Sequence, residues 1–518
     1  MTRLLFFLLL LAPLAGADTL ALMDGRFVDD RPIAKAEGGY KVTFENGEIF
    51  VPDEMVVYVY RDDDTIDFTP KNEEEKAKFE KGQVPWKGRW VSKSYAIRLR
   101  EKELASRKTR IAQMLERRLW RNHAVVKSKR WVFLHTLPDE IFSELVQMFE
   151  DYFEFYCKFW KIRPPPKFGK ATMHLYHNED YFLQVSGAPK GVAGYYVPSL
   201  RELHFYYDRA HHDFAIAVMF HETSHLLTHM INPKMHYPAW LNEGMAEVFG
   251  GTEYNEKTGN MEIGAVQSGR LAILQSSIGD ESGKQGGRTA AGKSITNWMG
   301  LEKLMRSPRI DALGYAWAWS FCHFLITSDH YSKGFKKYFL AMGRSRSIKR
   351  RHGRVETVDP NEAIRALKRF LKVKDIKALE KEWHDSVKEL ITRTDLDWHE
   401  AGYIMLLWKQ NKKARQFFKK AIDAGSTNAF DYYNYARLQL LRGRYGVTLR
   451  RAEEALKFDP LHARAWSVLG YAKFLDGDRD DGKRCIQLAR ELDPSDNQIW
   501  LDEALIDEIE QDEKEEKG

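Results

Sequence analysis

Two histidines and a glutamate in the stretch MFHETSHLLTH, residues 219–229, have the types and spacing that could activate water on a metal ion. His221 and His225 stand four positions apart, so on a helix both rings would project from one face and could bind one zinc ion. Glu222 follows the first histidine, where a carboxylate could take a proton from water and return it to a leaving amine. In a chain of this length the HExxH spacing arises by chance with a probability on the order of a few per cent. Without a third ligand, a buried helix with hydrogen-bonded histidines is the alternative.

The next helix expected from the sequence supplies further carboxylates. Residues 236–251, HYPAWLNEGMAEVFGG, place Pro238 where a helix can begin and a Gly pair where it can end. Glu243 and Glu247 are four positions apart in this segment, so both carboxylates would lie on one helix face. The sequence therefore predicts two consecutive helices that each present side chains able to bind a metal or move a proton.

The WLNEG motif, residues 240–244, resembles the third-ligand helix of the gluzincins, the clan of zinc peptidases that includes thermolysin and the alanyl aminopeptidases. The resemblance implies that Glu243 is the third zinc ligand beside His221 and His225, with Zn²⁺ as the cofactor. It also implies that Glu247 is the carboxylate that holds His221 in the tautomer that a metal ligand needs.

A third segment resembles the tyrosine helix of the aminopeptidase branch of this clan. In GYAWAWSFCHFL, residues 314–325, Tyr315 is followed ten residues later by Leu325. The resemblance implies that the Tyr315 hydroxyl stabilises the oxyanion of the reaction. The alternative is an aromatic helix in a core that contains Trp317 and Trp319.

The segment before the HExxH motif is expected to form the edge of a sheet. Residues 191–208, GVAGYYVPSLRELHFYYD, are typical of two strands joined by a Pro-Ser turn, and such an edge strand could bind an extended substrate. The acidic GxMEN-type motif with which the aminopeptidase branch holds a substrate amino terminus is absent here, so exopeptidase activity is unsupported. The Gly- and Ser-rich residues 276–294 are expected to form a mobile loop over or beside the cleft.

These motifs belong to a predicted α+β domain over residues 120–392, which the resemblance identifies as a gluzincin-like metallopeptidase domain. Residues 130–136 and 171–176 have the pattern of strands, and residues 138–160 have the spacing of a long amphipathic helix. We expect this domain to carry the chemistry.

The start of the chain is typical of a secretory signal peptide over residues 1–17. Arg3 precedes an apolar run from Leu4 to Leu14, and Ala15-Gly16-Ala17 provides a small-x-small cleavage pattern. The apolar run is shorter than the roughly 20 residues of a spanning helix. We therefore expect an exported protein, periplasmic or extracellular, with no membrane span once the signal is removed.

A small all-β domain is predicted over residues 18–70, because short alternating runs are broken by turn residues, with an Asn-Gly hairpin signal at 45–48. Residues 71–119 are rich in Lys, Glu and Arg and are expected to form a linker followed by a charged helix. The role of the β domain is not readable from the sequence.

The last hundred residues repeat with a period of 34, shown by Asp459-Pro460 and Asp493-Pro494. This is the tetratricopeptide period, and the resemblance to that family gives three repeats over residues 393–496 that form an all-α solenoid. Residues 497–518 are expected to form a capping helix and an acidic tail. The repeats could bind a protein partner, although their first role would be stability.

Composition limits the classes of partner. The net charge of +6 is small for 518 residues, and both signs are interleaved, so no nucleic-acid partner is expected. Three widely spaced cysteines give no disulfide framework. The sequence predicts a multidomain, exported, zinc-dependent endopeptidase that acts on a peptide or protein. A zinc amidase acting on a cell-wall peptide shares these features. The other alternative is a tetratricopeptide binding or assembly protein with an inactive or peptide-holding peptidase-like domain.

Overall fold

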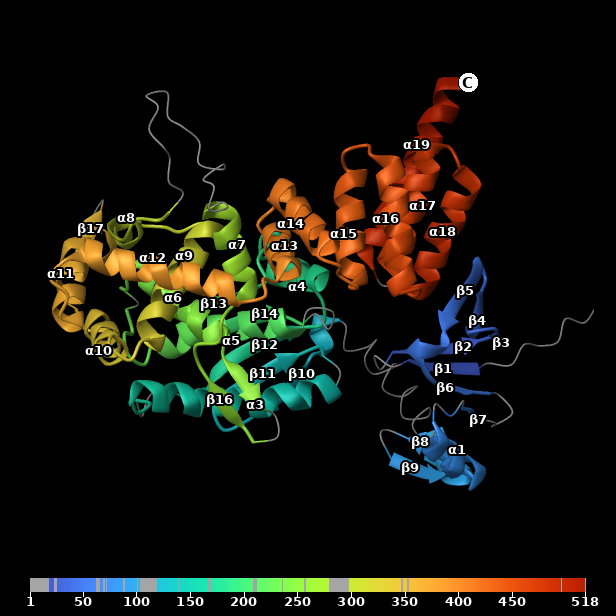
Figure 1. Ribbon diagram of the computed structural model, residues 1–518, viewed down its shortest axis with the longest axis horizontal. Coiled ribbons are helices and arrows are strands. Elements are labelled where there is room, and N and C mark those ends of the chain that lie inside the picture. The colour runs from blue at the N-terminus through green and yellow to red at the C-terminus, as the bar shows by residue number, and fades with distance from the viewer. Residues whose placement is uncertain are drawn as a thin grey trace, which may run out of the picture. The chain divides into compact units, whose positions relative to one another are not determined.

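The computed structural model describes the chain from residue 18 to residue 517, apart from residues 23–25, 62–65, 69, 71, 87–88, 100, 103–118, 138, 166–168, 208–211, 235, 256–257, 279–297, 346–347, 352–353 and 495. The expected signal peptide, most of the expected mobile loop and part of the expected charged helix lie outside the described residues. The chain divides into two compact units (Figure 1), unit 1 with Met1–Thr109 and Ile422–Gly518, and unit 2 with Arg110–Ala421.

Unit 2 contains a five-stranded sheet made of β10 (Ala124–Lys127), β11 (Trp131–His135), β12 (Ala171–Tyr176), β13 (Gly194–Val197) and β14 (Glu202–Tyr206). The strand order is β10-β11-β12-β14-β13. The three central strands are parallel, and both edge strands run antiparallel to their neighbours. The strands predicted at 130–136, at 171–176 and within 191–208 are confirmed.

Three helices cover this sheet: α3 (Asp139–Trp160), α4 (Glu179–Ser186) and α5 (His212–Thr228). On one face, Trp131 of β11 packs against Phe149 of α3, which in turn contacts Phe220 of α5. On the other face, Phe182 of α4 packs against Tyr176 and Tyr206. The sheet is therefore the middle layer, and α5 lies on the same side as α3.

The rest of unit 2 is mainly helical: α6 (Ala239–Gly250), α7 (Ser268–Ile278), α8 (Leu301–Arg306), α9 (Ala312–Thr327), α10 (Ser332–Gly343), α11 (Pro360–Leu371), α12 (Ile376–Arg393), α13 (Trp398–Leu407) and α14 (Asn411–Asp423). Two short hairpins join them, β15 (Glu253–Asn255) with β16 (Asn260–Glu262) and β17 (Ile348–Arg351) with β18 (Arg354–Val358). Most of α9 is buried at the centre of this half, and Trp317, Trp319 and Phe321 are fully buried there.

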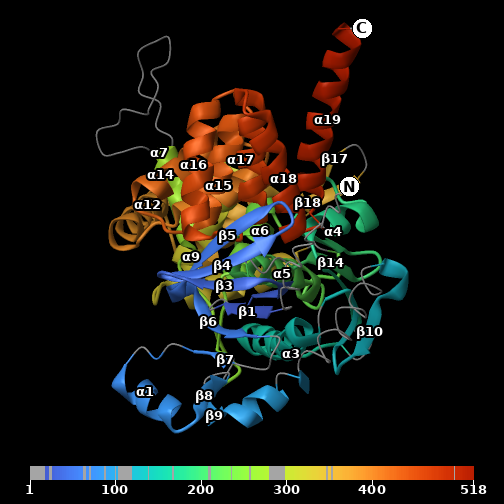
Figure 2. The same cartoon turned by 90° about the vertical axis from the view of Figure 1, so that its right-hand side faces the viewer.

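Unit 1 begins with two small sheets, one of β2 (Phe27–Arg31), β1 (Asp18–Leu22), β6 (Val56–Tyr60) and β7 (Ile66–Asp67), and one of β3 (Ile33–Ala36), β4 (Gly39–Phe44) and β5 (Gly47–Pro52), with the 3-10 turn η1 (Asp53–Met55) before β6. The predicted hairpin is confirmed, with Glu45 and Asn46 as its loop. The core of these sheets includes Leu488 from a repeat helix and Leu461 from the turn between two repeat helices. Figure 2 shows β4 and β5 in front of those helices.

The stretch expected to be a linker contains regular structure. Helix α1 (Glu73–Glu80) is followed by a hairpin of β8 (Gln83–Trp86) and β9 (Arg89–Ser92), and residues 93–99 and 101–102 are helical. Phe68 and Phe79 pack together and Phe68 meets Trp90 edge-on, so a few aromatic contacts order a segment whose composition is mostly charged.

Helix pairs form the C-terminal region: α15 (Ala429–Leu440), α16 (Tyr445–Phe458), α17 (Ala463–Asp476), α18 (Arg479–Leu492) and then α19 (Asn497–Lys517). The starts of α15 and α17 differ by 34 residues, as do the starts of α16 and α18. Ala436, Ala455 and Ala489 are fully buried, as close pairing of repeat helices requires. The chain therefore ends in a helical repeat region.

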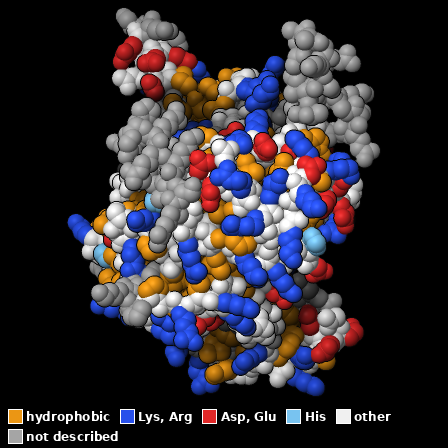
Figure 3. Space-filling model, turned by 90° about the vertical axis from the view of Figure 1, so that its left-hand side faces the viewer, with side chains coloured by type: hydrophobic (Ala, Val, Ile, Leu, Met, Phe, Trp, Pro, Cys, Tyr) orange, Lys and Arg blue, Asp and Glu red, His pale blue; other side chains and the backbone are white. Residues whose placement is uncertain are grey.

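Charges on the surface follow the pattern of the sequence. On the face drawn in Figure 3, lysine and arginine side chains are spread widely, with aspartate and glutamate between them. The three cysteines are buried and unbonded. Within the described parts of the chain, no helix combines the length and the apolar character of a membrane crossing.

Candidate metal centre

Helix α5, which carries the HExxH residues, is anchored from behind by α3. The Tyr152 hydroxyl donates a hydrogen bond to the Phe220 carbonyl at 3.0 Å, and the Tyr156 hydroxyl lies 2.8 Å from Thr228 Oγ1. Both tyrosines are fully buried. These contacts, one turn apart on α3, fix α5 against sliding and rotation.

Helix α6 approaches α5 and α9 closely because two of its residues are glycine. A Cβ at Gly250 would lie 2.9 Å from the Ala217 carbonyl oxygen of α5. A Cβ at Gly244 would lie 2.6 Å from the Ala318 carbonyl oxygen of α9. Both distances are too short for a side chain. The glycine of WLNEG therefore places the adjacent Glu243 between the two helices.

The three expected ligands meet at one point. His221 Nε2 and His225 Nε2 are 3.2 Å apart, and Glu243 Oε2 lies 3.4 Å from the first and 3.3 Å from the second. Zinc bonds of about 2.0–2.1 Å at a tetrahedral centre place neighbouring donors about 3.3–3.4 Å apart. The donor atoms therefore have the spacing that zinc requires.

Hydrogen bonds orient these donors. His221 Nδ1 lies 3.3 Å from Glu247 Oε1, so its other nitrogen, Nε2, carries the lone pair toward the shared point. Arg270 of α7 donates two hydrogen bonds of 2.8 Å to Glu247. The Asn242 amide donates to Glu243 Oε1 at 3.1 Å and leaves Oε2 for the histidines.

The electrostatics favour a divalent cation. Burial lowers the pKa of the His221 imidazole, but Glu243 and Glu247 outweigh it and raise that pKa to about 10. Burial raises the pKa of Glu243, but the histidines outweigh it and hold the pKa well below its usual range. Burial likewise raises the pKa of Glu247, and Arg270 reverses the effect. Arg270 neutralises Glu247, so the ionised Glu243 remains beside the two histidine rings, where a divalent cation could replace the proton on His221.

The two expected catalytic side chains lie beside the ligands. Glu222 Oε1 is 4.0 Å from His221 Nε2, and burial raises the pKa of this carboxyl. The Tyr315 ring centroid is 6.2 Å from that of His221. Burial, followed by the nearby carboxylates, raises the pKa of Tyr315, so its hydroxyl stays protonated and can donate a hydrogen bond. All six residues expected from the sequence thus come together.

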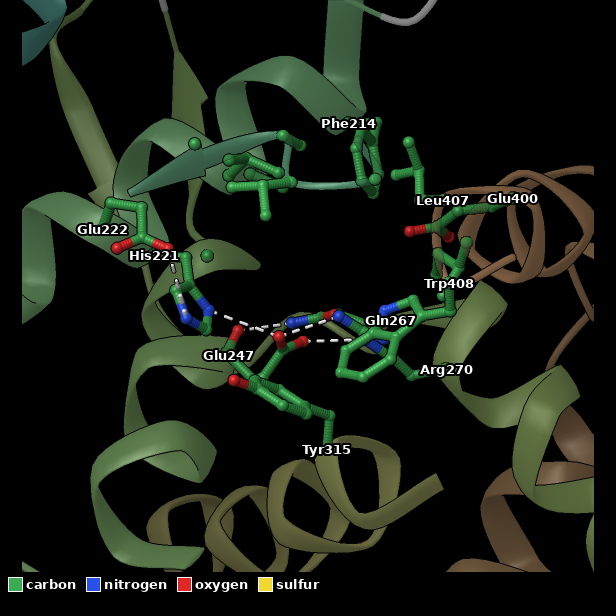
Figure 4. Close-up of a pocket in the computed structure, with 18 of the residues that line it drawn as sticks. Phe214, His221, Glu222, Glu247, Gln267, Arg270, Tyr315, Glu400, Leu407 and Trp408 are labelled. Carbon is green, nitrogen blue, oxygen red and sulfur yellow. Dashed lines mark hydrogen bonds and ion pairs between the residues drawn. The ribbon is translucent and has the colours of Figure 1, made fainter. Parts of the chain in front are cut away.

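A cavity of about 500 Å³ opens beside His221 and Glu222. In Figure 4 these two residues stand at one end, Tyr315 and Arg270 lie along one side, and Leu407 and Trp408 lie toward the other end. Residues 190–194, which lead into the edge strand β13, also line the cavity. The centre therefore faces a pocket large enough for a substrate side chain.

Helix α13, the first helix of the expected repeats, forms part of this pocket. Glu400 accepts a hydrogen bond of 3.0 Å from the Gly269 backbone N–H, and burial, then Asp397, raise its pKa to about 7. A Cβ at Gly191 would collide with the Leu407 carbonyl. The helix predicted to start a separate repeat array at residue 393 thus belongs to the compact unit of the metal centre.

Sequence analysis did not identify the pocket residues Arg270, Glu400 and Trp408, nor Asn242. Asn242 directly precedes Glu243 within WLNEG, so its position was available in the sequence although its role was not. Arg270 lies on α7 and Glu400 on α13, which Trp408 follows, and no fixed spacing connects these three to the ligands. One signal for them is that Arg270 is the only charged residue in α7, SGRLAILQSSI. A lone charge in an otherwise uncharged helix indicates a buried partner.

Comparisons with known proteins match one family model over part of the chain and give no activity. Residues 215–379 match the family described as Protein of unknown function (DUF1570), a segment that runs from α5 into α12 and contains all the residues of the metal centre but not Glu400. No curated protein matches the chain.

Two solved structures resemble part of the chain. One is the first TPR of Spaghetti (RPAP3) bound to the HSP90 peptide SRMEEVD, at 19% identity over 22% of this chain and 89% of that one, with a TM-score of 0.20. The other is the Sgt2 TPR domain from Aspergillus fumigatus, at 21% identity over 23% and 80% of the two chains, with a TM-score of 0.21. We assign the repeats from the 34-residue spacing of the helix pairs in this chain, and not from these two similarities.

Proposed function

We propose that the protein is a zinc-dependent peptidase, of endopeptidase type, with its centre at His221, His225 and Glu243. The observation that carries this proposal is the set of donor distances, 3.2, 3.3 and 3.4 Å, next to an unligated carboxylate. A buried helix with hydrogen-bonded histidines would not need a third donor equidistant from both rings. Nor would it need Arg270 to hold the carboxylate behind His221.

Each side chain has a role that follows from its position. Bound zinc would supply a Lewis acid that polarises the scissile carbonyl and acidifies a water. Glu222 takes the proton of the attacking water and delivers it to the leaving amine, and burial gives it the raised pKa that suits such transfers. Tyr315 donates its hydroxyl hydrogen to the developing oxyanion.

The surroundings of the centre support a peptide substrate. β13 is an edge strand that pairs with β14 on one side only among the described residues, so an extended chain could add to its other side. The part of the pocket away from the proposed ligands is lined by apolar side chains, those of Phe214, Ile404, Leu407 and Trp408. We infer that a bulky apolar side chain next to the cleaved bond occupies this region.

We also propose that the protein is exported, because its first seventeen residues have the pattern of a secretory signal peptide. A periplasmic or extracellular peptidase of this kind would meet protein substrates outside the cytoplasm. The helical repeats would hold a protein partner or substrate away from the pocket. The second candidate, an exported binding or assembly protein without hydrolytic activity, is favoured by the repeat helices themselves.

The test is mass spectrometry of a diverse peptide pool incubated with wild type, Glu222→Gln and a chelator-treated sample. Glu302→Gln, which removes an exposed glutamate on α8, is the matched control. We expect internal cuts in wild type and in the control, and none in Glu222→Gln although it keeps its zinc. Cleavage by Glu222→Gln at the wild-type rate would refute the mechanism. Absence of both zinc and cleavage in wild type would favour the binding protein.

A further inference from the structure

A second group of metal-binding side chains meets on the sheet face opposite α5. His174 of β12 and His204 of β14 are directly paired across the two strands, and Glu202 precedes His204 by two residues. All three therefore project from the same face. Glu202 Oε2 lies 3.9 Å from His174 Nε2 and 3.7 Å from His204 Nε2.

Both ring nitrogens of His174 are buried without a hydrogen-bond partner in the described chain. Buried polar atoms in native proteins nearly always have a partner, so this ring requires an explanation. His204 differs, because its Nδ1 lies 3.1 Å from the Tyr176 hydroxyl. That contact orients the ring so that Nε2 faces Glu202.

Glu202 has no lysine or arginine partner in the described part of the chain. Its ion pairs among the described residues involve only the two histidines.

We propose that His174, Glu202 and His204 bind a divalent transition-metal ion, for which zinc is the best match. Two imidazole nitrogens and one carboxylate oxygen are a donor set that zinc accepts. The present distances exceed the tetrahedral spacing by about 0.3–0.6 Å. The His174 and His204 rings are stacked, with centroids 4.2 Å apart and planes 12° from parallel, so one ring must turn out of the stack before both Nε2 lone pairs can point at one ion. Glu202, with 29% of its side chain exposed, leaves a path for the ion.

Aromatic rings enclose this second site. Trp120 stacks on His174 with centroids 5.6 Å apart, and Tyr195 stacks on His204 at 4.7 Å. The alternative is that the histidines only fill an aromatic stack. That alternative leaves both His174 nitrogens unpartnered, whereas a metal ion would bind Nε2 and would also contact the Glu202 carboxylate. The ion would join β12 and β14, so we assign it a structural role.

The experiment measures zinc stoichiometry in full-length protein that is first stripped with a chelator, then loaded with Zn²⁺ and freed of excess metal. Wild type is compared with His174→Gln, Glu202→Gln and His221→Ala. His330→Gln, which removes an exposed histidine elsewhere in unit 2, is the matched control. Circular dichroism of the metal-free proteins identifies any variant that fails to fold, and Glu202→Gln, the most exposed of the three ligands, is the variant least affected by that problem.

We expect two zinc ions in wild type and in His330→Gln, and one in His221→Ala. His174→Gln should also bind one, and Glu202→Gln should bind the second ion at least about tenfold more weakly. The same stoichiometry and affinity in wild type, His174→Gln and Glu202→Gln would overturn the proposal. The outcome is separate from the proposed peptidase. A wild type that bound a single zinc ion, kept in His221→Ala and lost in His174→Gln, would support this site and contradict the other.

Discussion

Replacement of Glu400 by glutamine should stabilise unit 2 above pH 7 and should flatten its pH dependence. Glu400 is half-buried on α13, where its carboxylate accepts the Gly269 N–H. Burial, followed by the charge of Asp397, raises its pKa from an ordinary 4.5 to about 7. Glutamine keeps an oxygen for the Gly269 N–H and carries no charge at any pH, so the substitution isolates the cost of ionisation.

The sign and size follow from proton linkage. Because the pKa is higher in the folded chain, the unfolded chain loses this proton first as the pH rises. The free energy of unfolding therefore falls between pH 4.5 and about 7, and is independent of this group on either side of that window. The pKa difference corresponds to about 3 kcal/mol at 1.36 kcal/mol per pH unit. Glu400→Gln should match wild type near pH 4.5 and exceed it by up to about 3 kcal/mol at pH 8.

The assay is urea denaturation from pH 4.5 to pH 8, followed by hydrogen–deuterium exchange in peptides from α7 and α13, which reports on unit 2 alone. Glu389→Gln on α12 is the control, because Glu389 is exposed and pairs only with Arg393 among the described residues. A stability difference between wild type and Glu400→Gln that stayed constant across this range would refute the reasoning. So would a variant that was less stable than wild type at pH 8.

Two further substitutions test the pocket. Arg270→Met leaves Glu247 buried without its cation, so we expect a loss of about 3–5 kcal/mol in unfolding free energy, measured by urea denaturation. In a competitive zinc titration of the same variant, zinc affinity should fall by about 10–100-fold. An unchanged affinity would show that Arg270 is not needed to hold Glu247 against His221. Trp408→Ala should lower kcat/KM by about 10–200-fold for peptides with a bulky apolar residue beside the cleaved bond. Peptides with alanine there should be nearly unaffected, and an equal loss for both would contradict the placement of Trp408 in that pocket.

The two candidate histidine ligands could be predicted from the sequence because their geometry is local. His221 and His225 lie on one helix at a spacing that fixes their relative positions, and Glu243 lies on the next helix, 18 residues after His225. The strands β11 and β12 and the helix α3 were predictable for a similar reason. Within residues 130–176, apolar residues recur with the period of a strand or of a helix. Local periodicity was sufficient for these elements, whereas Glu243 was placed beside the histidines through the resemblance of WLNEG to the third-ligand helix of the gluzincins.

The residues that were not predicted reach the centre through tertiary packing. Arg270 contacts Glu247 only because α7 packs beside α9 and α6 beside α5, and sequence periodicity does not determine which helices are neighbours. His174 and His204 meet because β12 and β14 are adjacent although β13 separates them in sequence. The hairpin of β8 and β9 was not predicted because its strands are short and their few apolar residues lie among many charged ones, so no alternating strand pattern is recognisable.

Helix α13 shows why the repeat period and the compact units divide the chain differently. Its residue Gly402 packs against the Phe418 ring of α14, the close approach that a repeat pair requires. Other residues of α13 contact the sheet and α7 of unit 2. The Tyr403 hydroxyl lies 3.2 Å from the Tyr206 hydroxyl, and Glu400 accepts a hydrogen bond from the start of α7. One helix therefore satisfies two packing surfaces at once. Helix α13 and the residue Trp408 that follows it line the proposed substrate pocket. Substitutions on α13 should therefore be interpreted first as changes to that pocket and only then as changes to the repeats.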